Sequence, residues 1–146
     1  MLKGEDAIRA EIPDFDLLRL GEVRWLLVEF YRSEDDQRVQ LADLVLNAVY
    51  HQDSSIYYLT IAFREVQQLA LPELGGSWYQ IGELNIDPVS DRGMERINYH
   101  VLDHLDAMSC YCRDVCFIEL SRRKDDEREE RVWKADVSAI SRYHVG

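Results

Sequence analysis

The chain has 146 residues, of which 47% are hydrophobic and 31% charged, a composition typical of one globular domain. Its formal net charge of −11 argues against a sequence-neutral nucleic-acid binder and against docking on an anionic membrane, because both require cationic side chains. The acidic excess lies in residues 1–107, where 20 acids face 9 bases, whereas residues 108–146 carry 8 of each. A field of this sign favours fast association with a basic partner, although such a charge also serves solubility alone.

Targeting and cysteine usage point to a reducing compartment. No stretch reaches the roughly 18 apolar residues of a membrane span, and the first residues lack the apolar segment of a signal peptide. Cys110, Cys112 and Cys116 are odd in number and close together, unlike the evenly paired cysteines of a secreted disulfide scaffold. We therefore expect a cytoplasmic protein with reduced thiols.

The first third of the chain is ambiguous in its periodicity. Residues 1–16 are polar and are expected to lead into the fold as an N-terminal arm or a short helix. Residues 17–32 fit both a helical and a strand period, and their aromatic and β-branched content favours a strand. Residues 39–51 also fit both, and a helix is slightly favoured because Asp43 and Asn47 would fall opposite the apolar side chains. Strand or helix stays open for both segments.

The alternation of apolar side chains is clearer after residue 55. Residues 56–63 are apolar on both faces, which predicts a central strand. Further strands are expected over 66–71, 78–86, 96–103 and 109–120. In the last of them, Cys110, Cys112 and Cys116 would share one face. Residues 122–131 are expected to form an exposed charged loop, followed by an amphipathic piece over 132–143 of undetermined type.

Strands that follow one another every 10–15 residues or so predict a mainly β fold. The expected architecture is one domain over residues 1–146, built as an antiparallel sheet or sandwich with one or two peripheral helices; an α+β arrangement is the alternative. A parallel α/β fold is disfavoured because the sequence has no glycine-rich strand-to-helix turn.

The cysteines and histidines are the first candidate metal ligands. Zinc sites usually combine two pairs of ligands, with two to four residues between paired cysteines, whereas Cys110, Cys112 and Cys116 follow a C-x-C-x3-C pattern without a second pair. His100 and His104 would share a face of a helix, but the strand pattern around them removes that geometry. We expect buried cysteines that behave as small apolar residues, with no metal and no cofactor.

Motifs for catalysis are missing from the sequence. It has neither the Gly-x-Ser-x-Gly elbow of a hydrolase nor a phosphate-binding glycine loop. The paired carboxylates Asp35–Asp36 and Asp125–Asp126 lie in polar runs, where nothing apolar would raise the pKa of a general acid. The sequence therefore predicts a protein that is not an enzyme.

Four apolar patterns carry a family resemblance. They are Phe63-x2-Val66-x2-Leu69-x-Leu71, Ile81-x2-Leu84-x-Ile86, Glu95-x3-Tyr99-x-Val101-x-Asp103 and Tyr111-Cys112-x2-Val115-x-Phe117. In this order the stretch from about Leu17 to Leu120 resembles small bacterial immunity proteins of polymorphic-toxin or contact-dependent competition systems. The resemblance implies a cytoplasmic, non-enzymatic protein that binds and blocks a cognate toxin. It transfers no functional residue, because the matched positions are typical of a core.

The leading hypothesis is an inhibitor whose acidic face covers the basic active site of a protein toxin. Its candidate partner-binding residues are the acidic turn and an aromatic pair after a Gly-Gly turn: Glu34, Asp35, Asp36, Trp78 and Tyr79. One alternative is a small-molecule-binding or catalytic β-domain whose pocket is lined by Tyr57, Trp78, Tyr79 and His100. Another is a structural or regulatory subunit that oligomerises through the same surface, and the oligomeric state stays open.

Overall fold

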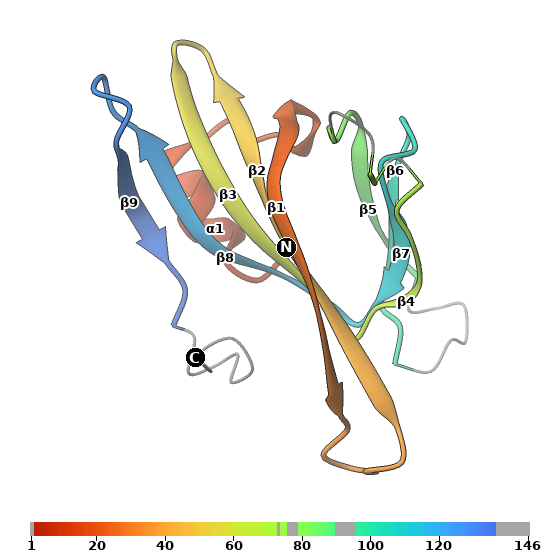
Figure 1. Cartoon of the computed structure of the whole chain (residues 1–146). Helices are drawn as coiled ribbons and strands as arrows, with labels where there is room; N and C mark the ends of the chain where they lie inside the picture. The colour runs from red at the N-terminus through yellow and green to blue at the C-terminus, as the bar shows by residue number, and fades with distance from the viewer. Residues whose placement is uncertain (1, 73, 76–78, 90–95, 137–146) are drawn as a thin grey trace.

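A computed structural model describes residues 2–72, 74–75, 79–89 and 96–136 of the chain (Figure 1). These residues are mainly β, as predicted, and form two antiparallel sheets and one α-helix. The elements are α1 (Glu5–Glu11), the 3-10 helix η1 (Leu17–Arg19), β1 (Leu20–Arg32), β2 (Gln40–Gln52), β3 (Ser55–Arg64), β4 (Gln67–Ala70), β5 (Leu84–Pro88), β6 (Tyr99–Asp103), β7 (Ser109–Cys112), β8 (Asp114–Arg123) and β9 (Glu129–Lys134).

The larger sheet has the strand order β1-β2-β3-β8-β9 and is strongly twisted (Figure 1). Strands β1 and β2 pair along almost their whole length, from Leu20 opposite Tyr50 to Arg32 opposite Gln40. Strand β3 pairs with β2 only as far as Leu44. The end of the β1–β2 hairpin is therefore a two-stranded ribbon that extends beyond the rest of the sheet, at the bottom of Figure 1.

The smaller sheet has the order β4-β7-β6-β5, and its apolar side chains share one core with the larger sheet. Alternate residues of the larger sheet supply its centre: Leu44, Leu46, Ala48 and Tyr50 from β2, and Leu59, Ile61 and Phe63 from β3. The smaller sheet adds Leu84, Val101, Cys110 and Cys112. Both faces of β3 are buried, which confirms the predicted central strand.

The N-terminal segment is part of the core. Ile8 of α1 and Ile12, which directly follows the helix, are almost completely buried, and the ring of Phe15 stacks on Tyr50 with centroids 5.2 Å apart. The Tyr50 hydroxyl also accepts a 2.9 Å hydrogen bond from the backbone N–H of Asp16. Of the two forms expected for residues 1–16, the short helix is the one observed, and it packs on the sheet instead of projecting as an arm.

The helix favoured for residues 39–51 is wrong, because β2 occupies this segment. The two polar residues that suggested a solvated helix face are buried and hydrogen-bonded across the sheet. The amide of Asn47 donates to the Thr60 hydroxyl at 3.0 Å, and Asp43 accepts from the Tyr31 hydroxyl at 2.7 Å. Because these polar groups are buried and find partners across the sheet, the strand is covered on both faces, and its sequence pattern resembles that of an amphipathic helix.

The single strand expected over residues 109–120 is also wrong. The chain leaves the smaller sheet after Cys112 and enters the larger sheet at Asp114. Cys110 and Cys112 therefore face the main core, whereas Cys116 packs with Val45, Ala62 and Ile118 in a second cluster. The three cysteines do not share a face.

Two smaller expectations are refined. Of the strand expected over 78–86, the described residues show β5 only from Leu84, while residues 79–81 run along β1. Of residues 122–131, expected to form an exposed charged loop, only 124–128 form the exposed turn that links β8 to β9; the others belong to these two strands.

Candidate functional site

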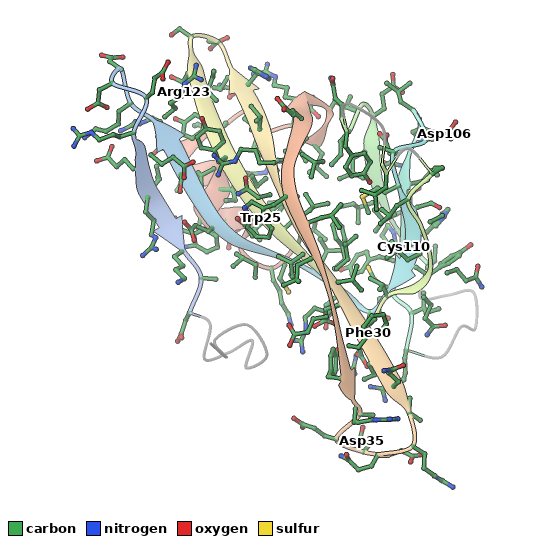
Figure 2. The ribbon with its side chains drawn as sticks, viewed as in Figure 1. Trp25, Phe30, Asp35, Asp106, Cys110 and Arg123 are labelled. Atoms are coloured by element: carbon green, nitrogen blue, oxygen red, sulfur yellow. The ribbon has the colours of Figure 1, made fainter. Side chains whose placement is uncertain are left out.

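Exposed apolar side chains gather on the β1–β2 hairpin. Seven large apolar residues of the described chain are exposed, and four of them belong to this hairpin: Trp25 (45%), Leu27 (52%), Phe30 (63%) and Val39 (43%). We call residues 25–45 the hairpin arm. Figure 2 shows Trp25, Phe30 and Asp35 following one another along the arm towards its tip.

The arm presents apolar side chains on both faces. Cross-strand pairing places Trp25 opposite Asn47 and Leu27 opposite Val45, on the face turned away from the main core. Phe30 pairs with Ala42 on the other face. Because a group of exposed large apolar side chains commonly marks an interaction site, the arm is the strongest candidate functional region.

The tip of the arm carries the predicted acidic turn, Glu34, Asp35 and Asp36. The Asp35 side chain is 85% exposed and lies 3.7 Å from the Arg96 guanidinium. The Asp36 carboxylate accepts hydrogen bonds from Arg38 Nε at 3.1 Å and Nη2 at 3.2 Å, and these bonds lower its pKa. Asp36 is therefore suited to remain ionised near neutral pH, and Asp35 presents its carboxylate to solvent.

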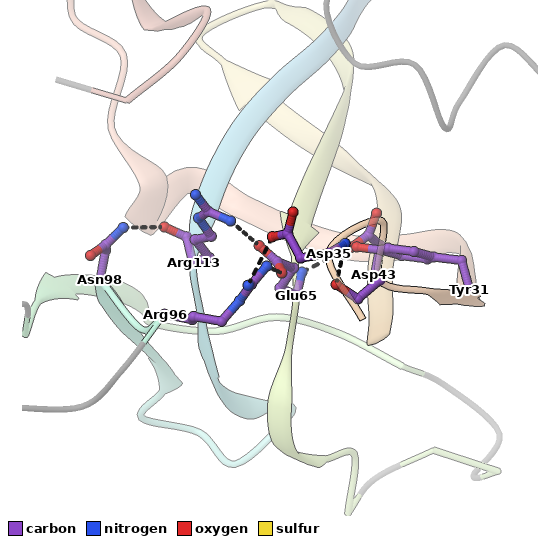
Figure 3. Close-up of polar contacts among 8 residues, drawn as sticks. Tyr31, Asp35, Asp43, Glu65, Arg96, Asn98 and Arg113 are labelled. Carbon is purple, nitrogen blue, oxygen red and sulfur yellow. Dashed lines mark hydrogen bonds and ion pairs between the residues drawn. The ribbon is translucent and has the colours of Figure 1, made fainter. Parts of the chain in front are cut away.

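A buried polar network holds the base of the arm (Figure 3). Asp43 is completely buried, and its Oδ1 atom accepts hydrogen bonds from the Tyr31 hydroxyl at 2.7 Å and from the Glu65 backbone N–H at 2.8 Å. The Glu65 side chain in turn accepts from Arg96 Nη2 at 2.5 Å and from Arg113 Nη1 at 3.0 Å. The network joins the arm to the β3–β4 corner and to the link between the two sheets.

Glu65 is only 8% exposed, and it combines two ion pairs with an unfavourable backbone conformation. Burial acts to raise its pKa, but the hydrogen bonds from Arg96 and Arg113 outweigh this effect and lower the pKa. Glu65 and Arg96 both have positive φ, +52° and +63°, a backbone conformation that is unfavourable for residues other than glycine. Ionic contacts therefore hold two strained residues beside the arm.

The space around this network is a cavity of about 180 Å³ lined by charged groups of both signs. Its lining includes the arginines Arg64, Arg96 and Arg113 and the acids Glu34, Asp35 and Glu65. Because carboxylates already bind Arg96 and Arg113, the arrangement suits positioning of the arm better than capture of an anion.

Of the aromatic pair predicted at residues 78 and 79, the structure describes only Tyr79. Trp78 lies outside the described residues. Tyr79 is half-buried against the core, its hydroxyl donates to the Ala107 carbonyl at 2.7 Å, and its own carbonyl accepts from Val23 N–H at 3.0 Å. Burial, with a contribution from the Asp103 charge, raises the pKa of Tyr79 to about 12. Tyr79 therefore has a packing role.

The other residues of the alternative aromatic pocket are also apart. Tyr57 is buried and donates to Glu11 of α1 at 3.0 Å, while His100 stacks on Tyr111 with ring centroids 4.5 Å apart. A cavity of about 350 Å³ lies between the N-terminal segment and β5, but its lining comprises other residues, such as Phe15 and Leu84. The structure does not bring Tyr57, Tyr79 and His100 together.

The three cysteines are free and buried. A hydrogen bond with Cys110, together with burial, raises the pKa of Cys112, and burial raises the pKa of Cys116. Across the described residues, no group of three or more His, Cys, Asp or Glu side chains is arranged to hold a metal ion. These thiols are therefore placed as core side chains.

Trp25, Leu27 and Phe30 were absent from the residues predicted at the site. The sequence marks them only as part of an apolar strand, and their exposure depends on the absence of a further strand beside β1 in the described sheet.

Comparison with known proteins adds no relative: no protein-family model, curated protein or solved structure matches the chain. Within the described residues no helix is both long enough and apolar enough to cross a membrane.

Proposed function

We propose that this chain is a cytoplasmic, non-enzymatic inhibitor of the immunity type, which binds a cognate bacterial toxin and occludes its basic active site. The hairpin arm is the inhibitory element in this proposal. The observation that carries it is an acidic tip and four exposed apolar side chains on one hairpin: Phe30 and Val39 lie on its projecting ribbon, and Trp25 and Leu27 lie where the hairpin joins the sheet.

The two parts of the arm would contribute differently to binding. The carboxylates of Asp35 and Asp36 attract a basic cleft over distances of about 10 Å and so raise the association rate. Burial of the apolar side chains by a partner contributes favourably to the free energy of binding. Trp25 should contribute most, because tryptophan is enriched among the residues that dominate binding energy. The tip supplies steering and the flanks supply affinity.

The base of the arm supports this role by limiting its motion. A binding element that is already ordered loses less conformational entropy on association. Asp43 fastens Tyr31 of β1 to the β3–β4 corner, and Glu65 fastens that corner to Arg96 and Arg113. The arm is thus held in place before a partner arrives.

The test is protection of growth in bacteria that express a toxin domain. The gene neighbourhood is expected to encode a large secreted toxin; the chain is co-expressed with the C-terminal domain of that protein, and the wild type is expected to restore growth. The double variant Asp35→Lys/Asp36→Lys should lose most of this protection. Asp125→Lys/Asp126→Lys is the matched control, because these residues follow Arg123, which lies at the opposite end of the molecule from Asp35 (Figure 2).

Growth arrest despite abundant folded wild-type chain, together with no binding between the purified proteins, would contradict the proposed function. Equal protection by both charge-reversal variants would leave inhibition standing but remove the acidic tip from it.

A further inference from the structure

Among the described residues, the outer edge of β1 has no strand neighbour along the hairpin arm. β1 is the first strand of the larger sheet, with β2 as its only strand neighbour in the described sheet. Residues 79–81 pair with the start of this edge, through hydrogen bonds of 3.0 Å from Val23 N–H to Tyr79 O and from Ile81 N–H to Gly21 O. Across the described chain, no backbone segment continues this pairing between Trp25 and Arg32.

The register shows which backbone groups face outward. Ser33 N–H donates to Val39 O at 2.9 Å, so this amide points towards β2. The β1–β2 register is uninterrupted from Trp25 to Arg32, and successive amides of a strand point in opposite directions. The odd-numbered residues therefore bond within the hairpin, while the amides of Leu26, Val28, Phe30 and Arg32 point away from the sheet.

This edge lacks the usual protection against added strands. Natural edges are blunted by lysine, proline, bulges or inward-pointing charges. Residues 25–32 read Trp-Leu-Leu-Val-Glu-Phe-Tyr-Arg and contain neither proline nor lysine, and both register shifts of β1 lie before Trp25. Glu29 is the one charge between Trp25 and Tyr31.

We propose that an extended basic segment of the toxin adds to this edge as a further strand of the larger sheet. The inference rests on the proposed function and specifies how the arm holds its partner. Main-chain hydrogen bonds to the outward amides would fix the segment, and its alternate side chains would cover Trp25 and Leu27.

The charge of the chain favours such a segment over a second copy. Pairing two β1 edges would bring together two chains that each carry a net charge of −11, which repel one another. A lysine or arginine opposite Glu29 instead forms a favourable cross-strand pair.

The experiment uses the full chain and the toxin domain of the growth assay as its probe. Amide hydrogen exchange is measured by NMR for the free chain and for the complex. Exchange at Leu26, Val28 and Phe30 is expected to slow by about tenfold or more on binding, because these amides gain partners. Val28→Pro removes one outward donor and should weaken binding by about tenfold, whereas Val28→Thr keeps the amide and should bind like the wild type.

Unchanged exchange at all three amides, with wild-type binding by Val28→Pro, overturns strand addition while inhibition stands. Failure of the wild type to bind the domain overturns the proposed function, and this inference with it. If the free chain sediments as a dimer with these amides already protected, a second copy covers the edge and the inference is wrong. Because exchange is read on wild-type protein, misfolding of Val28→Pro leaves the test decisive.

Discussion

The hydroxyl of Tyr31 donates a 2.7 Å hydrogen bond to the carboxylate of Asp43 across the base of the hairpin arm. Asp43 is fully buried, and the same oxygen accepts from the backbone of Glu65, so one carboxylate couples the arm to the β3–β4 corner. A buried carboxylate depends on such donors, because its desolvation is costly when they are lost.

The first prediction concerns this hydrogen bond. Tyr31→Phe removes the donor and leaves the ring, and the free energy of unfolding should fall by about 1.5–3 kcal/mol, the usual range for a hydrogen bond to a charged group. Urea unfolding measures the change. Tyr111→Phe is the control, because the described contact of Tyr111 is ring stacking on His100, and its effect should stay below about 0.5 kcal/mol. Equal losses in both variants would contradict the special role of Tyr31.

The second prediction is a pH dependence centred on Glu65. Its pKa in the folded chain is lowered from 4.5 by Arg96 and Arg113, so the folded state binds the proton less readily than the unfolded state. The resulting stabilisation is present above pH 4.5 and is lost as the pH falls through the lowered folded pKa.

Urea unfolding between about pH 3 and pH 7 tests this dependence on Glu65. Glu65→Gln should be less stable at pH 7 and should lose less stability on acidification than the wild type. Glu127→Gln, at an exposed position of the β8–β9 turn, should follow the wild-type curve. Parallel curves for Glu65→Gln and wild type would disprove the assignment.

The success of sequence reasoning depended on where each segment's neighbours lie. β3 was predictable because continuous apolar character over residues 56–63 is what two covered faces require. β2 was not, because Asp43 and Asn47 find partners on β1 and β3 that a single segment cannot reveal. The same limit applies at Arg113, where the chain changes sheets and separates Cys116 from Cys112.

The acidic tip of the arm could be predicted from local sequence, whereas the exposure of its apolar side chains could not. Glu34, Asp35 and Asp36 form a turn between two apolar segments, and consecutive charges are seldom buried, so their exposure followed from local sequence. The exposure of Trp25 and Leu27 follows from the position of β1 at the sheet edge, which is a property of strand order. Glu65 and Arg96 are separated by 31 residues, and nothing in the sequence around either residue predicts their contact.

The third prediction concerns the thiols. Burial and raised pKa values keep Cys112 and Cys116 protonated and shielded, and thiolate is the reactive form. A disulfide reagent should label none of the three cysteines in native protein at pH 8 and all of them in urea. Rapid labelling of one native cysteine would contradict this placement, and elemental analysis showing one zinc per chain would contradict their role as core residues.

The fourth prediction concerns Asp103, whose buried carboxylate accepts three backbone hydrogen bonds: from Gly82 at 3.1 Å, Glu83 at 2.6 Å and Ala107 at 2.9 Å. These bonds tie the segment before β5 to the turn between β6 and β7. Asp103→Ala should cost about 3 kcal/mol or more, because it leaves buried donors unpaired. Asp106→Asn, at an exposed neighbouring position whose positive φ of +67° suits asparagine, should change stability by less than about 0.5 kcal/mol in the same urea titration.

The last prediction is the salt dependence of association with the toxin domain. Asp35 is exposed and Asp36 is partly exposed near the end of a projecting ribbon, where few protein atoms lie between Asp35 and an approaching partner (Figure 2). Stopped-flow association should therefore slow as ionic strength rises from about 0.01 to 0.15 M, because the Debye length shrinks from about 30 to 8 Å.

The double variant Asp35→Lys/Asp36→Lys should associate more slowly and show a weaker salt dependence. Its urea unfolding midpoint should stay close to that of the wild type, since exposed ion pairs contribute little to stability. Asp125→Lys/Asp126→Lys should change the rate less, because these residues follow Arg123, which lies at the opposite end of the molecule from Asp35 (Figure 2). An association rate that is independent of salt would exclude steering by the tip and leave Trp25, Leu27 and the open edge of β1 as the source of recognition.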